Sequence, residues 1–179
     1  EAGAKIVYDV RASYAVKDVV AKCGGIALMN RVGHAFFKTR MRAERATFGG
    51  EVTGHYYFRN NFFADNGFIP ALLILELMSL KNQTLSELLQ PLREKYFVSG
   101  EVNTQMPTMD TANDKIEALA KRYSDGHLYR IDGISVEYPT WHFNVRASNT
   151  EPLLRLHLEG DTPDLMAKKR DEILELIRI

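Results

Sequence analysis

The sequence has a single cysteine, no excess of either charge and no long hydrophobic run, and each shortage excludes a class of protein. Cys23 alone cannot form an internal disulfide framework, and a lone thiol fits a reducing compartment, which predicts a cytoplasmic protein. Basic and acidic side chains number 23 each, so no overall field would attract nucleic acid or an acidic membrane. The longest apolar run, residues 68–75, contains Pro70 and is shorter than the roughly 20 residues of a membrane-spanning helix. We therefore expect neither nucleic acid nor a membrane as a partner.

The signatures of several catalytic and targeting mechanisms are also missing. The sequence has no Gly-x-Ser-x-Gly elbow, P-loop, paired-carboxylate motif or His-Glu-x-x-His zinc arrangement, so we expect no metal site and no obvious nucleophile. No signal peptide is recognisable. Because the sequence starts at Glu1 rather than methionine, we expect a trimmed chain or a piece of a longer protein. Cys23 shares helical spacing with Val16, Val19 and Val20, which predicts a buried, unreactive thiol.

The first half of the chain, residues 1–98, predicts an α/β layered domain. Strands expected at 5–10, 26–29 and 47–52 alternate with helices that begin near residue 13 and span 34–44. Two further helices follow. Asp65 or Asn66 can cap the first of them. Thr84 with Glu87 forms a capping box for the second, which Pro91 should stop or kink.

The second half, residues 99–179, predicts a separate α+β domain. Strands are expected at 97–106, 128–131, 134–138, 141–145 and 153–158, and Asp132-Gly133 is a strong hairpin signal. Thr111 is expected to cap one helix, and Thr162-Pro163-Asp164 to open the last. Strands grouped together with two helices are typical of the α+β class.

The connection between the last two expected strands contains the residue types that bind phosphate. Arginine offers a flat fork of donors that matches phosphate oxygens, and serine and threonine add short neutral donors. The candidate residues are Arg146, Ser148, Asn149, Thr150 and Arg155. The alternative is a polar connection whose arginines are solvated or salt-bridged, which Glu151 favours because a carboxylate repels a phosphate.

A second candidate loop, residues 49–55, has glycines on both sides of Glu51, Thr53 and His55. The glycines permit a tight turn that presents these polar side chains from one backbone. Glutamate accepts from paired sugar hydroxyls, threonine is a neutral partner, and histidine carries protons near neutral pH. The alternative is a glycine-rich turn with a surface histidine.

Two further candidates follow expected strands. Arg11 comes after the first strand, at the edge where layered α/β domains bind ligands, although it could instead form a salt bridge with Asp9. His34 lies between a strand and a helix that carries four cations, which we interpret as a solvated helix face rather than a nucleic-acid patch.

Taken together, these motifs resemble the α-D-phosphohexomutase family, and within it the phosphomannomutase/phosphoglucomutase branch. The stretch from Lys5 is similar to the start of the family's third domain. Residues 50–55 resemble its sugar-recognition loop, usually Gly-Glu-Met-Ser-Gly-His, and residues 146–155 resemble the phosphate-binding loop of its fourth domain. The run from His55 to Asn60 leans toward the phosphomannomutase type.

The resemblance implies a third, α/β domain over residues 1–98 and a fourth, TATA-binding-protein-like domain over residues 99–179. It implies an isomerase that moves a phosphoryl group between O6 and O1 of a hexose through a bisphosphorylated sugar. The phosphoserine and the Mg²⁺ loop of the family belong to earlier domains, so the implied chain is a C-terminal fragment, inactive alone. Mg²⁺ and a hexose bisphosphate activator would serve the full-length enzyme. The implied partners are mannose or glucose 1- and 6-phosphates and the N-terminal domains. A freestanding sugar-phosphate-binding module and a glucosamine-phosphate mutase remain alternatives.

By the same resemblance, each candidate residue has an implied role. Glu51 and Thr53, which replaces the usual serine, would grip the O3 and O4 hydroxyls. Arg11 would stabilise charge and His55 would transfer a proton at the reacting end, with His34 on the same cleft wall. The non-reacting phosphate would be held by the loop residues Arg146, Ser148, Asn149 and Thr150, with Arg155 at the end of the loop and Glu151 orienting an arginine.

Overall fold

The computed structural model describes residues 1–148 and 150–179, and the candidate residue Asn149 lies outside the described residues. The chain forms two compact units, Glu1–Lys95 and Tyr96–Ile179, which are described separately below. Unit 1 is the first of these and unit 2 the second.

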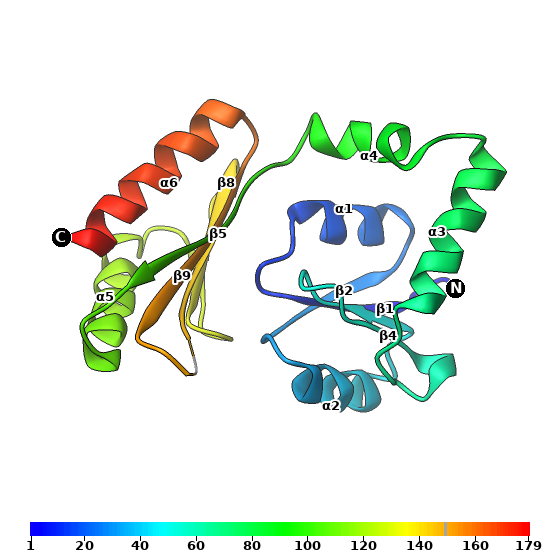
Figure 1. Cartoon of the computed structure of the whole chain (residues 1–179), viewed down its shortest axis with the longest axis horizontal. Coiled ribbons are helices and arrows are strands. Elements are labelled where there is room, and N and C mark those ends of the chain that lie inside the picture. Colours follow the sequence, from blue (N-terminus) through cyan, green and yellow to red (C-terminus); the bar gives the residue numbers. More distant parts are fainter. Residues whose placement is uncertain (149) are drawn as a thin grey trace. The chain divides into compact units, whose positions relative to one another are not determined.

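Unit 1 contains a four-stranded sheet in the order β2-β1-β3-β4, with helices α1 and α2 on opposite faces (Figure 1). The first three strands in space are parallel and β4 is antiparallel. The elements are β1 (Lys5–Asp9), α1 (Tyr14–Lys22), β2 (Ile26–Asn30), α2 (His34–Glu44), β3 (Phe48–Gly50) and β4 (Tyr56–Phe58). This architecture confirms the predicted α/β class.

The core of unit 1 lies between the sheet and α2. It consists of Val7, Phe37, Met41, Ala46 and Tyr57. Gly49 allows this packing, because a Cβ there would come within 2.6 Å of the sulfur of Met41. The parallel strands bring the carboxyl ends of β1, β2 and β3 to one edge, which is the edge where α/β domains bind ligands.

Two helices, α3 (Phe68–Lys81) and α4 (Leu85–Arg93), complete unit 1 after a short 3-10 turn, η1 (Arg59–Asn61). The side chain of Asn66 accepts from the first two N–H groups of α3, at 2.9 and 3.0 Å, so Asn66 rather than Asp65 caps this helix. The capping box of Thr84 and Glu87 is confirmed. Pro91 does not stop α4, which continues to Arg93, because proline removes only the hydrogen bond to the carbonyl of Glu87.

The prediction of a buried Cys23 is wrong. The thiol is exposed, because α1 ends at Lys22 and Cys23 occupies its C-cap position before a turn at Gly24. Helical spacing shows which residues share a face, but no described element covers this end of that face.

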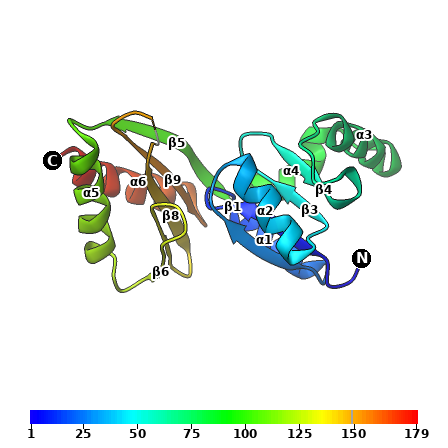
Figure 2. The same ribbon diagram turned by 90° about the horizontal axis from the view of Figure 1, so that it is seen from below.

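Unit 2 contains a five-stranded antiparallel sheet in the order β5-β9-β8-β7-β6, with both of its helices on one face (Figures 1 and 2). The elements are β5 (Phe97–Gln105), α5 (Met109–Arg122), β6 (His127–Tyr129), β7 (Ile134–Glu137), β8 (Trp141–Ala147), β9 (Leu153–Gly160) and α6 (Pro163–Arg178). The α+β class is confirmed, as is the cap of the last helix by Thr162.

Two local predictions in unit 2 need correction. The helix expected to be capped by Thr111 begins earlier, at Met109, and Thr108 is its cap, accepting from the N–H of Thr111. The β6–β7 hairpin is present, but β6 ends at Tyr129, so its loop is longer than Asp132-Gly133. Gly133 has φ +62°, and a Cβ there would lie 2.2 Å from the carbonyl oxygen of Val145.

Strand alternation gives the unit 2 sheet one apolar and one polar face. On β9, Leu154, Leu156 and Leu158 are fully buried in the core beneath α5 and α6. The residues between them, including Arg155 and His157, therefore point to the opposite face. This alternation determines where the candidate phosphate-binding arginines lie.

Candidate functional site

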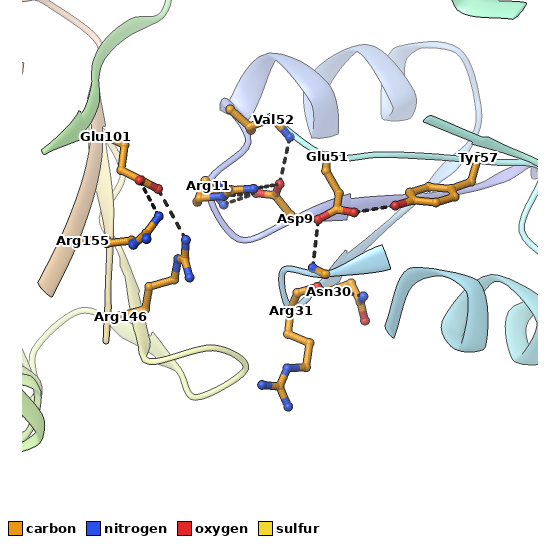
Figure 3. Close-up of polar contacts among 11 residues, drawn as sticks. Asp9, Arg11, Asn30, Arg31, Glu51, Val52, Tyr57, Glu101, Arg146 and Arg155 are labelled. Carbon is orange, nitrogen blue, oxygen red and sulfur yellow. Dashed lines mark hydrogen bonds and ion pairs between the residues drawn. The ribbon is translucent and has the colours of Figure 1, made fainter. Parts of the chain in front are cut away.

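In unit 1, Arg11 is held at the carboxyl edge of the sheet by the last residue of β1 (Figure 3). Asp9 Oδ2 accepts from Arg11 Nη2 at 2.8 Å, and Asp9 Oδ1 accepts from the Arg11 backbone N–H at 2.7 Å and from Nε at 3.2 Å. Asp9 Oδ2 also accepts from the backbone N–H of Val52 at 2.9 Å. Both side chains are buried. The alternative of a salt bridge to Asp9 is thus what the structure shows, and it fixes a permanent cation beside the 51–55 loop.

Glu51 is also buried, and each of its carboxylate oxygens has one protein donor (Figure 3). Oε1 accepts from the hydroxyl of Tyr57 at 2.6 Å, and Oε2 accepts from the backbone N–H of Gly33 at 2.9 Å. Burial, together with the hydrogen bond to Glu51, raises the pKa of Tyr57 well above its ordinary value, so the phenol remains a donor. Each carboxylate oxygen retains a second lone pair that can accept from a ligand hydroxyl.

Of the loop predicted at residues 49–55, Gly49 and Gly50 belong to β3, and the tight turn is confined to residues 51–55. The N–H of Glu51 donates to the carbonyl of His55 at 2.9 Å, and Gly54 has φ +86°. The three polar side chains of the turn do not project alike, since Glu51 points inward while Thr53 and His55 are exposed. His34 is exposed as well, at the first position of α2 and next to the glycine that binds Glu51.

His55 forms a pair with Asp65 that the sequence did not indicate. Asp65 Oδ2 lies 2.5 Å from His55 Nδ1, and Asp65 Oδ1 accepts from the backbone N–H of Tyr56 at 3.1 Å. Burial opposes ionisation of Asp65, but the bonds from His55 and Tyr56 outweigh it and lower the pKa of this carboxyl. A carboxylate on Nδ1 fixes the orientation of the imidazole and leaves Nε2 for a ligand. An isolated antiparallel β-bridge between Tyr57 and Asp65 holds the segment that follows η1 beside β4, and so brings Asp65 close to His55.

Arg31, which follows β2, is a further unit 1 residue that sequence reasoning missed. Its guanidinium lies 3.9 Å from the centre of the Phe36 ring. Its Nε is buried without a hydrogen-bond partner among the described residues. Its place directly after a strand is the signal that singled out Arg11, and the same reasoning could have identified Arg31.

In unit 2, Arg146 and Arg155 share one carboxylate, that of Glu101 on β5 (Figure 3). Glu101 Oε1 accepts from Arg155 Nη1 at 3.0 Å, and Oε2 accepts from Arg146 Nη2 at 3.5 Å. Glu151, which was expected to orient an arginine, is exposed, and the carboxylate that pairs with both arginines is Glu101. The salt-bridged alternative for these arginines is therefore present in the structure.

The loop after Arg146 brings two hydroxyls together. Ser148 Oγ lies 3.5 Å from Thr150 Oγ1 and accepts from the N–H of Thr150 at 3.4 Å. The N–H of Ser148 donates to the carbonyl of Leu153 at 2.8 Å, which closes the turn between β8 and β9. Ser148 is buried and Thr150 is exposed. Short donors thus follow directly on a buried arginine, an arrangement suited to an anion.

The residues present do not fit a magnesium ion. Across residues 1–148 and 150–179, no three histidine, cysteine, aspartate or glutamate side chains form a group that could hold a metal. Asp9 and Glu51, the buried carboxylates of unit 1, already accept from N–H and O–H donors, whereas Mg²⁺ requires open oxygen ligands. In the same described residues, no helix has the length and apolar character needed to cross a bilayer.

Comparison with known proteins places both units in one family. The family model described as "Phosphoglucomutase/phosphomannomutase, alpha/beta/alpha domain III" matches residues 1–96, and "Phosphoglucomutase/phosphomannomutase, C-terminal domain" matches residues 99–176. A phosphomannomutase of Escherichia coli is 43% identical over 178 residues, which are 98% of this chain and 39% of the relative. A phosphomannomutase of Vibrio cholerae is 44% identical over 182 residues, covering 99% of this chain and 39% of the relative.

A solved structure extends this similarity to the fold. The phosphoglucomutase/phosphomannomutase family protein of Burkholderia thailandensis superposes with a TM-score of 0.81 at 29% identity, covering 99% of this chain and 38% of that one. The present chain thus spans about two fifths of the length of the relatives it matches.

Proposed function

The chain belongs to the phosphoglucomutase/phosphomannomutase family, as its motifs indicated, and on that premise we propose that it is the hexose- and phosphate-binding part of a phosphomannomutase. The parent reaction would interconvert hexose 1-phosphate and 6-phosphate through a bisphosphorylated sugar. The observation that carries the proposal is the pair Arg146 and Arg155, held by one carboxylate at the start and end of a hydroxyl-bearing loop.

Unit 1 would recognise the hexose. Glu51 is fixed by Tyr57 and by the backbone of Gly33, so its free lone pairs point in defined directions without further ordering. A fixed carboxylate that accepts from two neighbouring hydroxyls selects for their spacing, and Thr53 would add a neutral contact from the exposed turn. His34 would border the same sugar, because it follows the glycine that binds Glu51.

His55 and Arg11 would act at the reacting oxygen. Asp65 holds Nδ1 of His55, so Nε2 would take the proton from an attacking hydroxyl or return it to the leaving oxygen. Arg11 is permanently charged and cannot serve as a base, so its role would be to stabilise negative charge during phosphoryl transfer. Asp9 fixes the guanidinium for that role.

Unit 2 would hold the non-reacting phosphate. Arg146 supplies the buried cation, Ser148 and Thr150 supply hydroxyls, and Arg155 supplies a second cation on the neighbouring strand. Asn149 belongs to this proposed set by its place in the motif. A charge-assisted site of this kind keeps one end of the substrate anchored while the other end reacts.

The remaining parts of the reaction would belong to a longer protein. No site among residues 1–148 and 150–179 fits Mg²⁺. The family's phosphoserine motif is not in the sequence. We therefore propose that the ion and a hexose bisphosphate activator serve the whole enzyme and that this chain is inactive alone. The single thiol supports a cytoplasmic location for that enzyme.

Helix α3 supports the existence of preceding domains. It is apolar nearly all round, yet none of its residues is buried, and Leu72, Leu75 and Leu80 are 65%, 60% and 79% exposed. A helix with this composition is normally covered on several sides. We propose that the domains that precede this region in the longer relatives pack against α3.

Binding of mannose 6-phosphate to the 179-residue chain tests the proposed function. In a calorimetric titration, Arg146→Ala should abolish phosphate-dependent binding. Glu51→Ala should weaken discrimination between glucose 6-phosphate and galactose 6-phosphate, which differ only in the orientation of the O4 hydroxyl that Glu51 would bind. The matched control is Glu117→Gln, which breaks the exposed ion pair with Arg130, 2.6 Å long, and should change neither. If Arg146→Ala leaves the affinity unchanged, the phosphate site is refuted. A strong preference for glucosamine phosphate would favour the amino-sugar mutase instead.

A further inference from the structure

Glu101 joins the two candidate phosphate-binding arginines, and it lies on a different strand from either of them. It is 45 residues from Arg146 and 54 residues from Arg155 in the sequence. One carboxylate oxygen serves each guanidinium, so the contact is shared rather than bidentate. A carboxylate at this position would repel a bound phosphate, so its presence beside the two arginines needs an explanation.

The two arginines form an unfavourable pair that Glu101 offsets. Arg146 on β8 and Arg155 on β9 are directly opposite each other in the antiparallel ladder. Like charges at such positions repel, and long side chains would turn away from one another. Glu101 pairs with His157 on β9, two residues from Arg155 and on the same face, so it reaches both guanidinium groups. The cluster keeps one net positive charge.

A β-bulge turns Glu101 toward the arginines. On β5, Val98 pairs with Glu159 and Glu101 pairs with His157, so two residues on β5, Ser99 and Gly100, lie opposite one on β9. Val98 lies on the face opposite the core, and unbroken strand alternation from Val98 would direct Glu101 into the core. Gly100 supplies the left-handed conformation of the bulge, with φ +69°, and Ser99 Oγ accepts from the N–H of Leu158 at 3.0 Å.

Each of the two arginines keeps one donor, its Nε–H group, that Glu101 does not use. The Nε atoms of Arg146 and Arg155 are both buried without a hydrogen-bond partner among the described residues. Buried N–H donors are rarely left unpaired, and those that are call for an explanation such as a missing ligand. Because Glu101 occupies Nη2 of Arg146 and Nη1 of Arg155, these Nε–H groups stay available when it is bound.

We propose that Glu101 is a positioning residue for phosphate binding, which holds Arg146 and Arg155 against their mutual repulsion with their Nε–H groups free for phosphate oxygens. The inference rests on the proposed phosphate-binding role of unit 2. Glu101 orders both guanidinium groups before the ligand arrives, so less side-chain entropy is lost on binding. The bulge at Ser99-Gly100 is the structural device that makes this possible.

The test is the affinity of the 179-residue chain for mannose 6-phosphate after Glu101→Gln and Glu101→Ala. Both variants should bind about tenfold more weakly, the size expected when one guanidinium must be ordered during binding. Glu117→Gln, which removes the carboxylate partner of Arg130 in the same unit, should bind like the unchanged chain. If Glu101 instead competes with phosphate for the arginines, both Glu101 variants would bind more tightly, and the inference would be overturned.

A double-mutant cycle separates positioning from loss of structure. In an Arg155→Gln background there is no opposing cation to offset, so Glu101→Gln should then change the affinity less than about twofold. An effect of unchanged size in that background would mean that Glu101 acts only through stability, against the inference. Arg146→Ala shows whether a negative result rejects the positioning role of Glu101 or the phosphate site itself. Loss of binding in Arg146→Ala without any effect of Glu101→Gln rejects the positioning role alone, whereas no effect of either variant rejects the phosphate site itself.

Discussion

Replacing Tyr57 with phenylalanine should reveal how far Glu51, the carboxylate proposed to bind the sugar, depends on the hydroxyl of Tyr57 for its orientation. Tyr57 is fully buried in the core of unit 1, and its hydroxyl donates to Glu51 Oε1 at 2.6 Å. The substitution keeps the ring, which stacks 5.5 Å from Phe37, and removes only the donor. The hydroxyl of Tyr57 lies within this buried side chain, so water cannot readily take its place.

The expected loss follows from the kind of bond removed. A hydrogen bond to a charged group contributes about 1.5–3 kcal/mol, and a buried acceptor left without its donor costs a similar amount. We expect Tyr57→Phe to lower the free energy of unfolding of unit 1 by about 2 kcal/mol. For a unit of this size, that corresponds to a fall in Tm of about 8–16 °C. Binding of mannose 6-phosphate should weaken too, because Glu51 is less well oriented.

The assay must report unit 1 separately. Trp141 is the only tryptophan and lies in unit 2, so its fluorescence follows unit 2, while amide exchange at Val7 in the core of unit 1 follows the first unit. The matched control is Tyr123→Phe, which removes a 2.8 Å bond to Glu172 in unit 2. It should destabilise unit 2 without changing hexose binding. Surface substitutions change the free energy of unfolding by up to about 0.5 kcal/mol. If Tyr57→Phe lowers that of unit 1 by no more than this, the hydrogen bond from Tyr57 to Glu51 does not stabilise the unit as expected.

Two other predictions concern the pair formed by His55 and Asp65 and the exposed helix α3. The pKa of Asp65 is lowered in the folded chain, so its contribution to stability is present above its unfolded value of about 4 and is lost as the pH falls below that value. Asp65→Asn should therefore flatten the acid limb of a stability-against-pH curve measured by denaturant unfolding, and an unchanged limb would contradict the pairing with His55. In a Cys23→Ser background, a cysteine in place of Leu72 should react rapidly with a maleimide in the 179-residue chain and more than about tenfold more slowly in the longer protein, as expected for a buried side chain. A cysteine in place of the exposed Thr39 is the control, and equal rates at position 72 in both proteins would exclude α3 as a docking surface.

Local signals in the sequence predicted most of the secondary structure. The start of α1 near Ser13, the capping box at Thr84 and the start of α6 at Thr162 each depend on residues within one turn of each other. These helix starts and caps can be predicted without knowing which other segments pack against them. The class of each half followed from the order of such elements.

The parts of the site that the sequence did not reveal depend on pairing between distant segments. Asp65 reaches His55 through the bridge to Tyr57, and Glu101 reaches the arginines through the register of β5 on β9. A glycine inside the expected strand, Gly100, was the one hint of a bulge, but it does not say which side chain the bulge redirects. Cys23 was misplaced for the same reason, since periodicity cannot show whether a face is covered.

Unit 1 is proposed to recognise the hexose and unit 2 the phosphate. A map of backbone amide chemical shifts in the 179-residue chain reports on the two roles separately. Inorganic phosphate should shift Ser148 and Thr150 alone, mannose should shift Gly33 and Val52 alone, and mannose 6-phosphate should shift all four. If mannose 6-phosphate at millimolar concentration leaves Ser148 and Thr150 unmoved, the phosphate site and the account built on it are contradicted.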